Sequence, residues 1–167
     1  GGNIDSFILS KLIRSSWMFW KGRSGEPYWN MPYSFRGHIV VLVNENTYSD
    51  GEALAEGFKQ LGLGTTIGMR TWGGQIWLNS SNRQSDGGLA RAPMIGVYGN
   101  NGDWLIEGRG YEPDIVLDNL PHETYNGKDA QLEAAIDLLK KKILEDPRDV
   151  PKVPAYPDKS FKNNRKE

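Results

Sequence analysis

Hydrophobic residues recur with helical spacing in three segments of the chain, and each of these segments predicts a helix. The segments are residues 4–13, residues 50–62 and residues 129–144. Asn3 precedes the first segment, where its side chain is suited to cap the helix. The last segment carries one apolar stripe, formed by Leu132, Ala135, Ile136, Leu139 and Ile143.

Strand patterns lie between the helical segments. The continuous apolar run at 39–43 has the length and β-branching of a strand buried on both faces, as in a parallel sheet. Shorter strands are expected at 65–68, 75–78, 89–98 and 114–118, with a polar loop between the second and third of these. A strand, a helix and a further strand imply a right-handed crossover. The pattern therefore predicts an α/β fold in which helices pack on a mostly parallel sheet.

Three segments have neither the helical nor the strand pattern of apolar residues. Residues 17–33 surround a Gly/Pro turn with six large aromatics, which predicts an irregular segment or loose hairpin. We expect these rings to form core beneath a long loop; a substrate groove or an oligomer contact is the alternative. Residues 99–103 predict a hairpin turn. We divide the chain into a domain at 1–145 and a Pro-rich, charged tail at 146–167 that is extended or disordered.

Composition narrows the classes of function. The 167 residues, 38% of them hydrophobic, suit one compact domain. Twenty basic and 21 acidic residues leave a formal charge of -1, so no global charge attracts nucleic acid. No apolar run approaches the roughly 20 residues that span a bilayer. Cysteine is absent and the two histidines are far apart, so we expect no disulfide, no metal site and no cofactor.

Ser49 stands where the first predicted strand meets the second predicted helix. One interpretation is structural, because Ser49 and Glu52 have the spacing of a capping box. The other is catalytic, because a serine at a strand-to-helix turn is held clear of the sheet beside the free N–H groups of the helix. Residues 47–51 approximate the Gly-x-Ser-x-Gly nucleophile elbow, with Thr47 replacing the first glycine. The residues alone leave both interpretations open.

Either histidine is a candidate base for Ser49. The chain order of an α/β-hydrolase triad is met by Ser49, Asp114 or Asp118, and His122. A self-contained esterase that uses this triad is therefore an alternative hypothesis. His122 lies in a polar loop, where a solvated histidine is the commoner outcome, and His38 at the end of the buried strand has the pattern of a structural histidine.

Two motifs are more specific than these patterns. Residues 44–52 read Asn-Glu-x-x-x-Ser-Asp-Gly-Glu, and residues 110–114 read Gly-x-x-Pro-Asp. Together with Gly-Gly-Asn at 1–3 and the helical segment at 128–139, they resemble the tricorn-type branch of the tail-specific (carboxyl-terminal processing) serine peptidases. The resemblance covers most of residues 1–144.

This resemblance implies a ClpP/crotonase-like α/β core in which Ser49 is the nucleophile of a serine endopeptidase. It implies an oxyanion hole formed by the N–H group of Asp50 with that of Gly2, or alternatively Gly1. In this branch the base is a histidine oriented by a serine, which in turn contacts a glutamate. Glu107 occupies the position of that glutamate.

The resemblance also bears on the base itself. The bacterial processing branch uses a lysine in a Thr-x-Gly-Lys-Gly segment, but residues 71–75 read Thr-Trp-Gly-Gly-Gln and contain no lysine. In family members the histidine lies upstream of the position of Gly1. We therefore expect that upstream residues have been removed and that the 167 residues alone have little or no peptidase activity, since loss of one triad member costs several powers of ten in rate.

The implied partners follow from this interpretation. We expect a peptide or unfolded polypeptide as substrate, the upstream part of the same catalytic domain as a neighbour, and a homo-oligomer. Gly73 and Gly74 are suited to let a peptide backbone approach, or they form a plain turn. A noncatalytic peptide-binding or assembly module of the same fold is the alternative from a different class. The compartment stays open.

Overall fold

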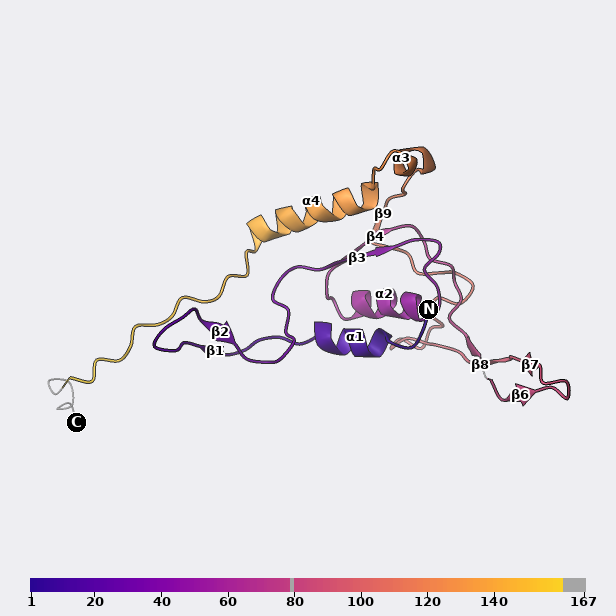
Figure 1. Ribbon diagram of the computed structural model, residues 1–167, viewed down its shortest axis with the longest axis horizontal. Coiled ribbons are helices and arrows are strands. Elements are labelled where there is room, and N and C mark those ends of the chain that lie inside the picture. Colours follow the sequence, from indigo (N-terminus) through magenta and orange to yellow (C-terminus); the bar gives the residue numbers. More distant parts are fainter. Residues whose placement is uncertain (79, 161–167) are drawn as a thin grey trace.

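A three-stranded parallel sheet is the centre of the computed structural model, which describes residues 1–78 and 80–160. Its strands, in spatial order, are β3 (Val40–Val43), β4 (Thr65–Gly68) and β9 (Ile115–Val116). The helices around it are α1 (Asp5–Leu12), α2 (Asp50–Gln60) and α4 (Ala130–Glu145). Figure 1 shows α4 on one side of the sheet, with α2 and then α1 on the other. The predicted α/β fold and all three predicted helices are confirmed.

The core lies between α2 and the sheet. Ala55 and Phe58 of α2 and Ile67 of β4 are fully buried. β3 and β4 approach so closely that a Cβ atom on Gly68 would lie 1.8 Å from the carbonyl oxygen of Val43, and Gly68 has a φ of +140°. Only glycine fits there. Because this pairing fixes the end of β3, it also fixes the turn that carries Ser49.

The aromatic segment is a hairpin, as predicted, but it is not core. β1 (Phe19–Trp20) pairs antiparallel with β2 (Tyr28–Trp29). Trp17 and Tyr33 are 72% and 75% exposed, and both residues of β2 are exposed as well. The expectation of a buried cluster is therefore wrong. The sequence pattern marks these rings as apolar, but the side chains that lie over them are basic ones, such as Lys11 over Tyr33 and Arg36 over Trp29, and most of these aromatic residues remain exposed.

The region after β4 differs most from the sequence prediction. It contains β5 (Trp77–Leu78), β6 (Asn82–Arg83), β7 (Leu89–Ala90) and β8 (Pro93–Ile95). The single strand expected at 89–98 is divided, because β7 pairs with β6 in a hairpin that includes the predicted polar loop, while β8 returns to pair with β5. Pro93 has no N–H group to donate to a continuous ladder, which favours this division.

The C-terminal part adds one unpredicted helix, α3 (Pro121–Tyr125), which begins with proline at its first position. On α4, Gln131 and Ala135 are buried, whereas Leu132, Ile136 and Ile143 of the predicted stripe are exposed. Residues 147–160 have no regular structure; Arg148 and Asp149 still form hydrogen bonds with residues 36–37, and the chain beyond them runs away from the body (Figure 1). Residues 161–167 of the predicted tail lie outside the described residues. None of the helices in the described ranges is long and apolar enough to cross a membrane.

Candidate active site

Ser49 forms a strained junction between β3 and α2. Its φ of 55° and ψ of -124° lie in a region that residues other than glycine rarely adopt, at a cost of about 1–3 kcal/mol. The turn before it is held by Thr47, whose N–H group donates to the carbonyl oxygen of Asn44 at 2.9 Å and whose hydroxyl accepts from the N–H group of Asn44 at 3.1 Å. The threonine at the first position of the elbow therefore has a structural function of its own.

Ser49 and Glu52 adopt the predicted capping-box arrangement. The stronger half comes from the carboxylate, because the N–H group of Ser49 donates to Glu52 Oε2 at 2.9 Å. The Ser49 hydroxyl lies over the start of α2 without a side-chain cap hydrogen bond of good geometry. Capping and a nucleophilic hydroxyl are thus compatible in one residue.

The Glu52 side chain does more than cap the helix. It is fully buried, and its two oxygens accept four hydrogen bonds. Besides the Ser49 amide, the donors are the Thr71 hydroxyl at 2.5 Å, the Gly73 amide at 2.7 Å and the Gly74 amide at 2.9 Å. One carboxylate therefore connects the elbow to residues 71–74. The sequence shows the capping partner but no signal for these distant donors.

The opening glycines lie beside the elbow that carries Ser49. A Cβ atom on Gly1 would lie 2.8 Å from the Tyr48 ring, and one on Gly2 would lie 3.7 Å from Asp50 Oδ2. Gly2 has a φ of +146°, in the region that favours glycine. Asp50 is the first residue of α2, where N–H groups have no partner within the helix.

Asp50 also joins the two helices nearest Ser49. Its Oδ2 accepts the N–H groups of Ile4 at 2.8 Å and Asp5 at 3.2 Å, so it caps the start of α1. Ile4 rather than Asn3 is the capping position, and its own side chain makes no cap hydrogen bond. The prediction of an Asn3 cap is therefore wrong. This capping carboxylate lies 46 residues away in the chain, where no local pattern reveals it.

Glu107 is exposed and binds backbone rather than a side chain. Its Oε2 accepts the N–H groups of Gln75 at 2.6 Å and Ile76 at 2.7 Å. It therefore orders the segment that follows residues 71–74. Its predicted contact with an upstream serine is not tested by these residues and stays a prediction.

Neither histidine lies at Ser49. His38 Nε2 is 2.7 Å from the carbonyl oxygen of Asp146, at the end of α4. His38 precedes β3 whereas Ser49 follows it, and at about 3.3 Å per residue the four residues of the strand alone separate them by roughly 13 Å. His122 is exposed on α3, next to Asn126. Figure 1 shows α3 on the opposite side of the sheet from α2.

The acid of the alternative triad also lies elsewhere. Asp114 Oδ2 accepts the Thr66 amide at 2.9 Å and the Thr66 hydroxyl at 2.8 Å, and Asp114 Oδ1 is 3.1 Å from Lys59 Nζ. Lys59 is ten residues beyond Ser49 along α2, roughly 15 Å at 1.5 Å per residue. Asp118 is exposed after β9. The structure does not assemble the esterase triad.

The charged groups near the C-terminal end of α2, Asp114 and Lys59, form a hydrogen-bonded network that stabilises the fold. Burial acts to raise the pKa of Asp114, but hydrogen bonds from Thr66 and Lys59 outweigh it and hold this pKa below its usual value. Burial acts to lower the pKa of Lys59, but its hydrogen bond to Asp114 and nearby negative charges raise it overall. Burial raises the pKa of Tyr111, which shares a 2.8 Å hydrogen bond with Thr66.

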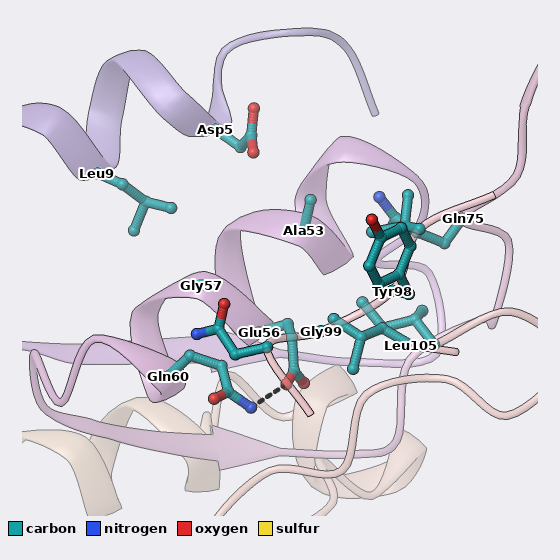
Figure 2. Close-up of a pocket in the computed structure, with 13 residues that line it drawn as sticks. Asp5, Leu9, Ala53, Glu56, Gly57, Gln60, Gln75, Tyr98, Gly99 and Leu105 are labelled. Carbon is teal, nitrogen blue, oxygen red and sulfur yellow. Dashed lines mark hydrogen bonds between the residues drawn. The ribbon is translucent and has the colours of Figure 1, made fainter. Parts of the chain in front are cut away.

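A cavity of about 280 Å³ opens one helical turn beyond Ser49. α1 and α2 form one wall, with Leu9 and Ala53, and the chain around Tyr98 and Leu105 forms the other (Figure 2). Gln75 lines it and is 1% exposed, and its Oε1 has no hydrogen-bond partner among the described residues. A ligand with a hydrogen-bond donor would satisfy that oxygen. Within the described part of the chain, no group of three or more acidic or histidine side chains is placed to hold a metal ion.

Known proteins match most of this chain. The profile of Peptidase family S41 matches residues 2–117. The tricorn protease of Thermoplasma acidophilum is 32% identical over 157 residues, which are 93% of this chain and 14% of that protein. A putative tricorn-like protease C-terminal subunit of Sulfurisphaera tokodaii is 36% identical over 145 residues, which are 87% of this chain and 17% of that protein.

Solved structures agree with the sequence matches. A crystal structure of the tricorn protease superposes with a TM-score of 0.81 at 33% identity, covering 86% of this chain and 14% of that chain. A putative peptidase from Parabacteroides merdae has a TM-score of 0.61 at 22% identity, covers 85% of this chain and 49% of that one, and shares the fold. The chain spans about 14% of the length of the tricorn protease. By its profile match over residues 2–117 and its tricorn relatives, the chain belongs to Peptidase family S41, a family of serine peptidases.

Proposed function

We propose that this chain is the part of a serine endopeptidase that carries the nucleophile, Ser49, and the oxyanion hole. The observation that carries the proposal is the strained backbone of Ser49 at the start of α2, with φ 55° and ψ -124°. Strain of this kind persists only where surrounding contacts enforce it, and it is common at active sites. The four hydrogen bonds to Glu52 are the contacts that enforce it here.

The reaction follows from this geometry. Ser49 Oγ attacks the carbonyl carbon of the peptide bond and transfers its proton to a base. The oxygen that becomes negative accepts hydrogen bonds from the N–H groups of Asp50 and Gly2, at the positive end of the α2 dipole. The C–N bond breaks, the amine leaves with the proton, and water then hydrolyses the acyl-enzyme on Ser49.

The base comes from outside these residues. Within the described residues, His38 is engaged with Asp146 and His122 lies on α3. Tricorn relatives are several times longer than this chain, which leaves ample sequence for a histidine and the serine that orients it. Glu107 is the group of this chain that we assign to that serine, because it is exposed and lies two residues beyond Leu105 of the cavity wall.

The substrate is a peptide or an unfolded polypeptide. The cavity beyond Ala53 has room for one substrate side chain, and the unpartnered Gln75 Oε1 favours a side chain that donates a hydrogen bond. The noncatalytic binding module remains the second candidate, since the same cavity and glycines would hold a peptide without cutting it. Peptide cleavage separates the two.

Hydrolysis of fluorogenic peptides by the full-length protein tests the proposal. We expect Ser49→Ala to lower kcat by at least about 10³-fold, because the nucleophile is lost. His122→Ala is the matched control and leaves kcat within about twofold. Activity that survives Ser49→Ala contradicts the proposal, and activity that depends on His122 would restore the esterase. Peptide binding without hydrolysis identifies the binding module.

A further inference from the structure

The side chain of Asp50 lies between the starts of two helices. Asp50 is the first residue of α2, and its Oδ2 accepts the N–H groups of Ile4 at 2.8 Å and Asp5 at 3.2 Å, where α1 begins. Figure 1 shows that α1 and α2 begin at the same end, beside the start of the chain. One carboxylate therefore connects the helix that follows Ser49 to the segment that carries the opening glycines.

This carboxylate holds the opening segment in place. Within the described ranges, the hydrogen bonds that join residues 1–5 to another element all end on Asp50. A Cβ atom on Gly2 would lie 3.7 Å from Asp50 Oδ2, so the backbone of Gly2 is close to the same oxygen. Gly2 and Ile4 are separated by one residue, and peptide units are rigid. Holding the N–H group of Ile4 therefore restricts where the N–H group of Gly2 lies.

The carboxylate is buried in spite of its charge. Asp50 is 3% exposed, and its Oδ1 has no hydrogen-bond partner among the described residues. An unpaired buried oxygen is costly, although the positive ends of the α1 and α2 dipoles act to offset this cost. Hydrogen bonds to a carboxylate are shorter and about twice as strong as neutral ones. Such bonds suit a group that must fix a position.

The same residue supplies one donor of the proposed oxyanion hole. In that proposal, the oxygen that becomes negative accepts the N–H groups of Asp50 and Gly2. The N–H group of Asp50 is fixed at the start of α2, whereas that of Gly2 belongs to a separate segment. Both donors must lie about 2.7–3.1 Å from this oxygen, so displacement of Gly2 weakens the site. The Asp50 side chain is placed to prevent that displacement.

We propose that the Asp50 carboxylate is a positioning group of the oxyanion hole, which holds the start of α1 so that the N–H groups of Gly2 and Asp50 meet the same oxygen. This inference rests on the proposed peptidase function and gives the Asp50 side chain a part in it. The carboxylate acts through Gly2 rather than on the substrate. Its negative charge would repel an oxyanion, so its contribution comes from the position that it imposes.

Hydrolysis of fluorogenic peptides by the full-length protein measures this contribution. Asp50→Ala keeps the N–H group of residue 50 but releases those of Ile4 and Asp5. We expect kcat to fall by about 10²-fold while KM changes by less than about threefold, because a displaced donor weakens the transition state more than substrate binding. Asp50→Asn keeps one accepting oxygen, and we expect its kcat to stay within about tenfold of the wild type.

Asp129→Ala is the matched control. Asp129 caps α4 by accepting the N–H group of Leu132 at 2.9 Å, and α4 lies on the opposite side of the sheet from α2 (Figure 1). Both alanine variants lose an aspartate cap, so we expect similar small drops in melting temperature. The kcat of Asp129→Ala should stay within about twofold of the wild type. An equal loss of kcat in the two alanine variants, or in Asp50→Asn and Asp50→Ala, overturns the inference.

Amide hydrogen exchange tests the same contact without catalysis. In full-length Asp50→Ala we expect faster exchange in the peptide that contains residues 2–8, measured by mass spectrometry, and no change there in Asp129→Ala. Exchange that does not depend on Asp50 overturns the inference. If exchange depends on Asp50 but the wild type hydrolyses no peptide, the contact is confirmed, while the peptidase, and with it the role of Asp50 in catalysis, is refuted. Hydrolysis by Asp50→Ala at the wild-type kcat refutes the inference alone.

Discussion

At the scale of the residue, Ser49 has the geometry of a helix cap and, in our proposal, is also the nucleophile, two functions that the sequence presents as alternatives. It starts α2 in a capping box, and its backbone is held in a conformation that suits glycine better than serine. A residue that served only as a cap would have no reason to carry this strain, because ordinary N-caps are extended. The strain is a cost in stability that a nucleophile in this position explains.

Two substitutions of Ser49 separate the energetic cost of the strained backbone from the loss of the capping hydroxyl. Ser49→Gly and Ser49→Ala both lose the hydroxyl, but only glycine relaxes the backbone at φ 55°. We expect the glycine variant to exceed the alanine variant in free energy of unfolding by about 1 kcal/mol. Urea unfolding of both variants measures this difference. A more stable alanine variant would contradict the assignment of strain to this residue.

Glu52 is the residue that we expect to maintain this conformation. Glu52→Gln replaces one of the two accepting oxygens by an NH₂ group, which donates. If it replaces Oε2, the NH₂ group faces the N–H groups of Ser49 and Gly74; if it replaces Oε1, it faces the Thr71 hydroxyl and the Gly73 N–H group. We expect a loss of about 3 kcal/mol in the free energy of unfolding, because buried donors lose their acceptor. Glu56→Gln on the same helix is the control, with an expected change below about 0.5 kcal/mol. Equal effects in the two variants would show that the Glu52 network contributes little.

At the scale of the element, the sequence predicts the helices and strands that have a periodic apolar pattern. It does not predict contacts between residues that lie far apart in the chain. The helices and the β3–β4 pair follow from apolar periods that recur over many residues. Three of the four donors to Glu52 (the Thr71 hydroxyl and the Gly73 and Gly74 amides) and the Asp50 cap of α1 join residues 19 to 46 positions apart, and local patterns carry no trace of them. The division of the strand expected at 89–98 was equally hidden, because it depends on which neighbour each half finds.

Asp114 joins two elements and makes the stability of the fold depend on pH. Its pKa is lowered in the folded protein, so its contribution is present above the unfolded pKa of about 3.9 and is lost as pH falls through the folded pKa. At pH 7 we expect Asp114→Asn to lower the free energy of unfolding by about 1 kcal/mol. This difference from the wild type shrinks at pH 3.

Urea unfolding at both pH values measures the effect of Asp114. The exposed Glu112, whose carboxylate is 3.8 Å from Arg70, provides the matched Glu112→Gln control with a small difference at either pH. A difference for Asp114→Asn that is the same at pH 3 and pH 7 would show that its charge does not link β4 to α2.

At the scale of the whole molecule, much apolar surface remains uncovered. Trp17, Tyr125 and Leu144 are 72%, 90% and 85% exposed, and they lie on three separate elements or segments. The chain spans about 14% of the length of the tricorn protease, and exposed apolar surface of this extent is typical of surfaces that contact other polypeptide. This fits the proposal that the nucleophile in this chain works with a base from another segment.

The site of covalent modification by a fluorophosphonate tests the central claim most directly. Such a probe reacts with a serine only when a base and an oxyanion hole activate it. After the full-length protein is treated and digested, mass spectrometry should find one adduct, on Ser49, and Ser49→Ala should abolish labelling. An adduct on another serine, or no adduct in a folded full-length protein, would contradict the account.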